Sequence, residues 1–263
     1  MQEERFQLNE TFIRILYLFN NFNRSKIERE LKNSIKIPHI HHILKLSSMP
    51  FRRKESDYQS PAEELANTIS HAFGLTGAII AAPFLIYYAA LNGDPFMVAG
   101  VSIFICTAIL LYLSSTVYHA VKEKKAKEIF QIVDHAAIFL LIAGTYTPFA
   151  LGVLKGVWGW TLFGIIWSIA IGGIILKVVA GVRWPRLSTA LYLIMGWMLI
   201  IAIRPLFENV PIESLIWVAL GGIAYTAGVI FFALPKIQFS HFIWHLFVLA
   251  GTACHVVAVA LVI

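Results

Sequence analysis

The sequence contains few charged residues and only two cysteines. Asp, Glu, Lys and Arg together make up 14% of the 263 residues, whereas 58% are hydrophobic. A folded domain with a water-exposed surface needs more charge than this, so the composition argues against an ordinary soluble protein and for an integral membrane protein. Cys106 and Cys254 both lie within apolar stretches, which argues against a disulfide framework. We expect both to be small packing residues.

The formal net charge is +6, with 21 basic and 15 acidic residues. A basic balance in a soluble protein can indicate nucleic-acid binding, but in a membrane protein basic residues mark the cytoplasmic loops. We therefore expect this protein to associate with a membrane and not with nucleic acid. The distribution of its basic residues then predicts the orientation of the chain in the membrane.

Seven apolar runs are long enough to cross a hydrocarbon core of about 30 Å, which takes about 20 helical residues. They are residues 69–90, 96–121, 129–153, 157–180, 187–203, 214–234 and 239–263. The connectors between them are short, so the predicted fold class is all-α, a seven-transmembrane-helix bundle in one compact domain.

Basic residues orient this bundle, because they are retained on the cytoplasmic side. The loops after the second, fourth and sixth runs carry eight, namely Lys122, Lys124, Lys125, Lys127, Lys177, Arg183, Arg186 and Lys236. The alternate loops carry two, Lys155 and Arg204. We therefore expect a multi-pass protein of the cell (plasma) membrane with a cytoplasmic N-terminus and an outside C-terminus.

The segment before the first run differs in kind. Residues 1–60 are polar, lack a typical signal-peptide pattern and contain "TFIRILYLFNNF", which could form an amphipathic helix on the inner leaflet. The alternative is a poorly ordered cytoplasmic extension, which we favour. Residues 61–263 are expected to form the membrane domain.

Ionisable residues gather near the predicted cytoplasmic ends of four runs. They are His71 in the first run, His119 in the second, Asp134 and His135 in the third, and His241 and His245 in the seventh. Such groups are costly within a membrane unless they are partnered. Their convergence at one depth therefore suggests a shared metal ion.

The spacing of the histidines fits such an ion. His241 and His245 lie four residues apart, one helical turn, so both imidazoles can face one ion, and His119 can supply a third nitrogen. Three histidines leave a fourth position for water, as in catalytic zinc sites, where the metal lowers the pKa of that water toward about 7. The alternative is that the pair serves packing or a hydrogen bond between helices.

Asp134 and Ser115 are the candidate catalytic residues. Asp134 is the only acidic residue inside the seven runs apart from their margins, and it could bind the metal, hold a water or act as general base. Ser115 lies four residues before His119 and could polarise a carbonyl, although back-bonding to its own helix is an equal alternative.

Two further histidines are not expected to bind the metal. His135 is adjacent to Asp134 and points about 100° away around the helix. His255 lies about 15 Å along the helix from His245, so we expect it to line a cavity or to be a satisfied interior histidine.

Together these positions resemble a known family. The set Ser115-x-x-x-His119, Asp134 in "FQIVDHAAIFLLIAGTYTPF" and His241-x-x-x-His245, with "SPAEELANTISHAFGL" and "GTYTPF", resembles the hemolysin III family. This family is the bacterial branch of the progestin and adipoQ receptor group, which includes the adiponectin receptors, and the resemblance covers about residues 60–263.

The resemblance implies a seven-helix membrane protein with a cytoplasmic N-terminus. In adiponectin receptors three histidines on the second and seventh helices hold zinc, and an aspartate on the third reaches it through water. Those positions correspond here to His119, His241, His245 and Asp134. The wider group also includes alkaline ceramidases, which hydrolyse a lipid amide.

Two functions remain open from the sequence. The first is a zinc-dependent hydrolase of a membrane lipid amide or ester, with Asp134 as base and Ser115 orienting the substrate. The second is a non-enzymatic sensor or homeostasis protein, in which zinc clamps the second and seventh helices together. In both, zinc affinity should fall below about pH 6.5, because protons compete for the imidazole nitrogens.

Overall fold

The computed structural model describes residues 59–263, except residues 92–93 and 235. This part of the chain forms one compact unit, Gln59–Ile263, built from helices and their connections. The possible amphipathic helix "TFIRILYLFNNF" and the rest of residues 1–58 lie outside the described residues.

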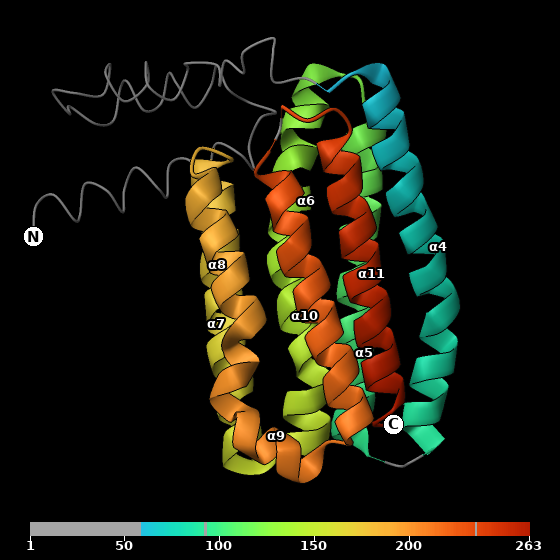
Figure 1. Ribbon diagram of the computed structural model, residues 1–263, viewed down its shortest axis with the longest axis vertical. Coiled ribbons are helices and arrows are strands. Elements are labelled where there is room, and N and C mark those ends of the chain that lie inside the picture. The colour runs from blue at the N-terminus through green and yellow to red at the C-terminus, as the bar shows by residue number, and fades with distance from the viewer. Residues whose placement is uncertain (1–58, 92–93, 235) are drawn as a thin grey trace, which may run out of the picture. The chain divides into compact units, whose positions relative to one another are not determined.

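Ten helical elements follow one another along the described chain. They are α4 (Pro61–Leu91), α5 (Pro95–Ala120), α6 (Lys124–Thr147), η2 (Pro148–Leu154), α7 (Gly156–Ala180), α8 (Pro185–Trp197), η3 (Met198–Ala202), α9 (Ile203–Asn209), α10 (Ile212–Phe232) and α11 (Ser240–Ala260). They make seven segments long and apolar enough to span a membrane, because η2 extends α6, and η3 and α9 extend α8. Figure 1 shows these segments side by side as a bundle, which confirms the predicted fold class.

Three predicted boundaries differ from the helix ends by five residues or more. The first span begins at Pro61 rather than at residue 69, the third begins at Lys124 rather than at residue 129, and the fifth ends at Asn209 rather than at residue 203. The first turn of α4 contains Glu63 and Glu64, so a search for apolar runs does not detect it. A capping box stabilises this turn, because Ser60 N donates to Glu63 Oε2 (2.8 Å) and Glu63 N donates to Ser60 Oγ (3.2 Å). The extra turn matters because it carries a residue of the candidate site.

Helix α5 lies at the centre of one half of the bundle, packed against α4, α6 and η2, while α10 packs along α11. Small residues bring these helices close. The side of Gly144 on α6 abuts the side chain of Thr107 on α5, and Gly173 on α7 abuts the ring of Phe139. Close van der Waals contact at these glycines therefore helps to fix the register between helices.

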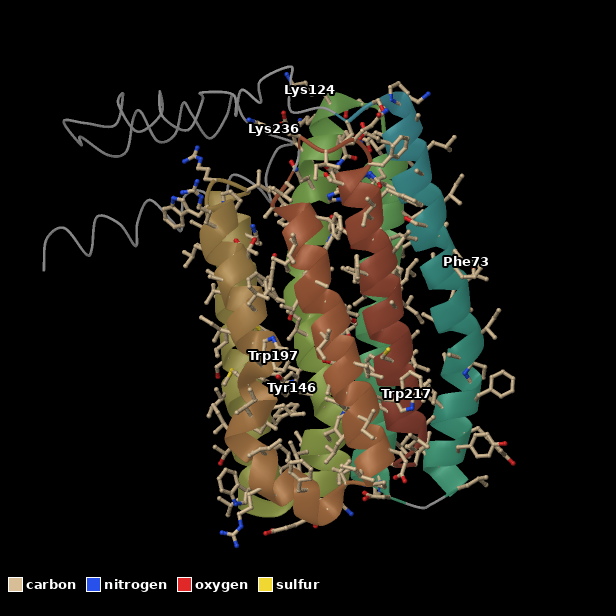
Figure 2. All side chains as sticks on the ribbon, in the orientation of Figure 1. Phe73, Lys124, Tyr146, Trp197, Trp217 and Lys236 are labelled. Carbon is tan, nitrogen blue, oxygen red and sulfur yellow. The ribbon has the colours of Figure 1, made fainter. Side chains whose placement is uncertain are left out.

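The outer surface of the bundle is apolar, as expected of a lipid-facing surface. Phe73 is 76% exposed and points away from the bundle (Figure 2). Both cysteines are free, as expected. The prediction that both are packing residues was wrong for Cys106, which is exposed on α5, because an apolar run does not reveal which face of its helix is buried.

A buried tyrosine stabilises the break between α8 and η3. Tyr146 Oη on α6 donates to the carbonyl oxygens of Met195 (2.6 Å) and Gly196 (2.9 Å) and accepts from Leu199 N (3.1 Å). A change of helix type leaves backbone groups without intrahelical partners, which is costly in a membrane. The "GTYTPF" segment thus has a structural role at this position.

The two ends of the bundle differ in charge. Lys124 and Lys236 lie at the end where α4 and α11 begin (Figure 2). At the opposite end Lys155 Nζ lies 2.5 Å from Asp94 Oδ2 and holds the pKa of that carboxyl below its ordinary value of 3.8. The basic loops thus share one end, as the sequence predicted, and their cytoplasmic location stays a prediction.

Candidate metal centre and adjoining cavity

Three histidines from two helices meet in the bundle. One ring nitrogen each from His119 on α5 and from His241 and His245 on α11 all lie within 4.8 Å of one another. The ring centroid of His119 lies 5.1 Å from that of His241 and 5.0 Å from that of His245. These residues could hold a metal ion, so the structure brings together the three residues that the spacing singled out.

The hydrogen bond of His119 suits a metal ligand. Its Nδ1 lies 2.7 Å from Glu64 Oε2 on α4. A carboxylate accepts hydrogen bonds and does not donate them, so Nδ1 carries the proton and Nε2 keeps its lone pair. A metal-ligating histidine ordinarily has such a carboxylate partner, which fixes the tautomer and the ring orientation.

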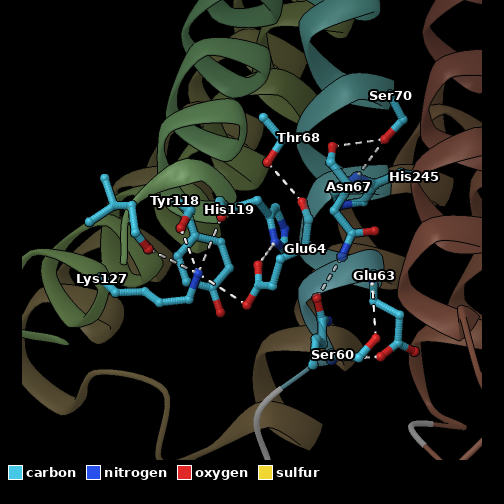
Figure 3. A network of polar contacts seen from close by, with 12 residues as sticks. Ser60, Glu63, Glu64, Asn67, Thr68, Ser70, Tyr118, His119, Lys127 and His245 are labelled. Carbon is cyan, nitrogen blue, oxygen red and sulfur yellow. Dashed lines mark hydrogen bonds and ion pairs between the residues drawn. The ribbon is translucent and has the colours of Figure 1, made fainter. Parts of the chain in front are cut away.

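His245 is fixed in a similar way through a hydroxyl. Its Nδ1 lies 3.1 Å from Ser70 Oγ, and that hydroxyl donates its hydrogen to the carbonyl oxygen of Asn67 at 2.9 Å. The hydroxyl therefore accepts from Nδ1–H, which leaves Nε2 of His245 as the acceptor. Figure 3 shows Asn67 and Ser70 on α4 beside His245. The donor set thus fits a metal ion held by ring nitrogens.

The first turns of α4 connect the elements that carry these histidines. Glu64 Oε1 binds Lys127 Nζ on α6 at 3.0 Å, and that ammonium also donates to the carbonyl oxygen of Tyr118 at the end of α5 (3.0 Å) (Figure 3). Glu63 Oε1 accepts from the backbone N of Phe239, directly before α11 (2.8 Å). One acidic pair therefore joins α4 to α5, α6 and α11 at the level of the cluster.

A cavity of about 910 Å³, measured with its open mouth, adjoins the cluster. The polar residues around its histidine end are His71, Ser115, Asp134, His241 and His245. Most of the remaining lining is apolar or aromatic and comes from α5, α6, α8, α10 and α11. A pocket of this kind suits a ligand with one polar group and an apolar chain.

The candidate catalytic residues both face this cavity. Asp134 on α6 is 6% exposed and lines it. Ser115 is fully buried, and its Oγ interacts with the side chain of Asp134 rather than with its own helix, whereas the neighbouring Ser114 Oγ donates to the carbonyl oxygen of Leu111 (2.9 Å). Back-bonding to its own helix, the alternative that the sequence left open for Ser115, therefore does not occur at this residue.

His135 and His255 also line the cavity but lie apart from the histidine cluster. The backbone carbonyl of His135 accepts from Tyr192 Oη (2.7 Å), which fixes α6 against α8. The ring of His255 fills the space beside Gly221 of α10. Lining the cavity is one of the two alternatives that the sequence left open for His255.

Two contributors to the site were missed by the sequence reasoning: Glu64 and Ser70. Glu64, Asn67 and His71 follow one another at intervals of three and four residues, which places them on one face of α4. A polar stripe on an otherwise apolar helix was the signal available. It was overlooked because Glu64 precedes the apolar run and Ser70 is an ordinary helix residue.

The fold and the site together define a multi-pass membrane protein with seven spanning helices and a buried histidine cluster. The profile of the family described as "Haemolysin-III related" matches residues 59–256. The chain belongs to this family.

Named relatives extend from bacteria to mammals. The chain is 49% identical over 191 residues to "Hemolysin-3 homolog" of Bacillus subtilis (strain 168), which covers 73% of this chain and 90% of the relative. It is 47% identical to "Hemolysin-3" of Bacillus cereus, covering 73% and 87%. It is 30% identical over 207 residues to human "Monocyte to macrophage differentiation factor", covering 75% and 83%.

Proposed function

We propose that this protein is a zinc-dependent hydrolase of a membrane lipid amide or ester, with the metal held by His119, His241 and His245. The observation that carries the proposal is the position of Asp134. A structural metal clamp between α5 and α11 has no need of a carboxylate, yet the buried Asp134 lines the same cavity as His241 and His245.

Each residue has a distinct task in this proposal. When bound at the three histidines, zinc would lower the pKa of a water molecule and polarise a carbonyl group. A carboxylate oxygen of Asp134 accepts the proton from the attacking water and returns it to the departing nitrogen or oxygen atom. Ser115 Oγ orients the substrate carbonyl by a hydrogen bond.

The remaining walls of the cavity serve binding and exclusion of water. Leu111, Ile138 and Ile142 are among the apolar residues that line it, and Trp244 and Val248 continue the lining along α11. Such a surface accommodates an acyl chain and keeps bulk water from the reacting group. This combination of apolar walls and a few polar groups supports a lipid amide or ester as the substrate.

The competing function is a sensor or homeostasis protein in which the metal only joins α5 to α11. Asp134→Asn and Ser115→Ala separate the two functions, because both retain the three histidines. We expect each variant to keep its metal content and unfolding temperature and to lose at least about tenfold in turnover, since a positioned base contributes about a hundredfold or more.

Turnover is measured with purified protein in detergent against a panel of ceramides, acyl amides and lipid esters. Glu213→Gln, at the first turn of α10, is the control for a general effect of removing an acidic residue. Stoichiometric metal without turnover of any member of the panel would contradict the hydrolase and favour the clamp.

A further inference from the structure

A fourth histidine, His71 on α4, lies against the cluster. Its ring stacks on that of His245, with centroids 3.5 Å apart and planes 9° apart, and meets the ring of Tyr112 edge-on at 5.2 Å. The side chain is buried, at 3% exposed, and it lines the polar end of the cavity. Its position is thus fixed on both sides by ring contacts.

This stacking prevents His71 from sharing an ion with His245. A metal ion lies close to the plane of each imidazole that binds it, because the nitrogen lone pair lies in that plane. Two nearly parallel rings at stacking distance have planes that do not meet at a common ion. His71 therefore stands beside the three candidate ligands rather than among them.

The polar atoms of His71 lack protein partners. Neither Nδ1 nor Nε2 makes a hydrogen bond to any described residue. A neutral imidazole carries one N–H donor and one acceptor, and leaving a buried donor unpaired is unfavourable. A group with this environment is normally completed by a ligand or by an ordered water.

Ser115 supplies a second polar group to the same cavity. It lies on α5 between Tyr112, which contacts His71, and His119, which contacts His245. Its hydroxyl is fully buried, makes no bond to its own helix and interacts with the side chain of Asp134, and all three residues line the cavity. The unpaired ring of His71 and the hydroxyl of Ser115 therefore come from two helices to one largely apolar cavity.

We propose that His71 N–H and Ser115 Oγ–H form a binding site for the carbonyl oxygen of a ligand whose chain occupies the apolar part of the cavity. This site rests on the proposed hydrolase function, for which it supplies the hydrogen bonds to an ester or amide carbonyl. Donors aimed at such an oxygen stabilise the negative charge that develops on it during hydrolysis. His71 is then a catalytic residue that contacts the substrate and does not bind the metal.

A ketone tests the site without turnover, because it has a carbonyl and an apolar chain but no leaving group. Methyl undecyl ketone, with and without an isotopic label at the carbonyl carbon, is added to the full-length protein as purified in detergent. The infrared difference between the two samples isolates the ketone carbonyl band. We expect this band at lower frequency in the protein than in empty micelles, because hydrogen-bond donors weaken the C=O bond.

His71→Phe keeps the ring contacts but removes the nitrogen atoms, and Ser115→Ala removes the hydroxyl with little change in volume. Each should shift the band back toward its position in micelles and weaken ketone binding about tenfold, the typical value of one such hydrogen bond. Ser114→Ala is the matched control, because Ser114 is also buried on α5 but its hydroxyl donates to the carbonyl oxygen of Leu111 and does not line the cavity. It should leave the band unchanged.

An unshifted band in the wild-type protein, or a shifted band that survives both His71→Phe and Ser115→Ala, would overturn the proposal and leave water as the partner of His71. Metal content and turnover of the lipid panel are measured on the same preparations. A band that responds as expected in a protein without metal or turnover supports the carbonyl site and contradicts the hydrolase. If His71→Phe retains turnover, the catalytic role of His71 is contradicted, but the hydrolase function is not.

Discussion

Glu64 Oε2 lies 2.7 Å from Nδ1 of His119, so a residue in the first turn of α4 fixes the tautomer of a candidate metal ligand on α5. The other oxygen of the same carboxylate binds Lys127 at 3.0 Å. This arrangement makes Glu64 a positioning residue that acts through His119.

Glu64→Gln should weaken metal binding, because the neutral amide is a poorer acceptor for Nδ1–H and no longer pairs with Lys127. Loss of such a partner typically lowers metal affinity about 10- to 100-fold. The affinity is measured by competition with a chromophoric chelator, and the absorption of the cobalt-substituted protein reports any change in ligand geometry. Glu128→Gln, an exposed position on α6, is the control, and equal affinities for the two variants would disprove the role of Glu64.

His245→Ala should lose the metal, because it removes one of three nitrogen ligands. His119→Ala and His241→Ala should do the same, whereas His255→Ala should retain the metal, since His255 is not part of the cluster. Metal analysis of detergent-purified protein gives identity and stoichiometry together. Full zinc content in His245→Ala at neutral pH would end the model of three histidine ligands.

Gly144→Ala should destabilise the bundle, because the added methyl group would meet the side chain of Thr107 on α5. Overpacking of this kind costs about 1–3 kcal/mol. Gly164→Ala on α7 is the matched control, since nothing lies within 4 Å of its added methyl group. Thermal unfolding in detergent compares the two, and a Gly144→Ala protein as stable as Gly164→Ala would show that α5 and α6 pack less closely than described.

Asp94→Asn should remove a small, acid-sensitive stabilisation at the end of the bundle away from the site. The Lys155 ammonium lowers the pKa of Asp94 in the folded protein, so the ion pair stabilises the fold above the ordinary value of 3.8 and ceases to do so as the pH falls through the lowered value. The effect is small because both partners are partly exposed.

Asn retains an oxygen that can accept from Phe96 N, so the helix cap of α5 is preserved in this variant. Unfolding temperatures of wild type and Asp94→Asn should therefore differ at neutral pH and converge as the pH falls below 3.8 and through the lowered pKa of Asp94. A difference that stays constant over this range would show that the ion pair does not contribute.

The sequence by itself determined the number and approximate extent of the spans, because any helix facing lipid must be apolar over about 20 residues. It also determined that His241 and His245 share a face, since the geometry of one helix fixes the direction of residues four apart. Both inferences concern single elements, whose periodicity is independent of what packs against them.

Only the tertiary structure decided which residues of other helices meet these histidines. Glu64 contacts His119, and His71 stacks on His245, because small residues and ring contacts set the register and rotation of neighbouring helices. These contacts join residues 55 and more than 170 positions apart in the chain. No local pattern specifies such a distance, since it depends on the packing of entire helix faces.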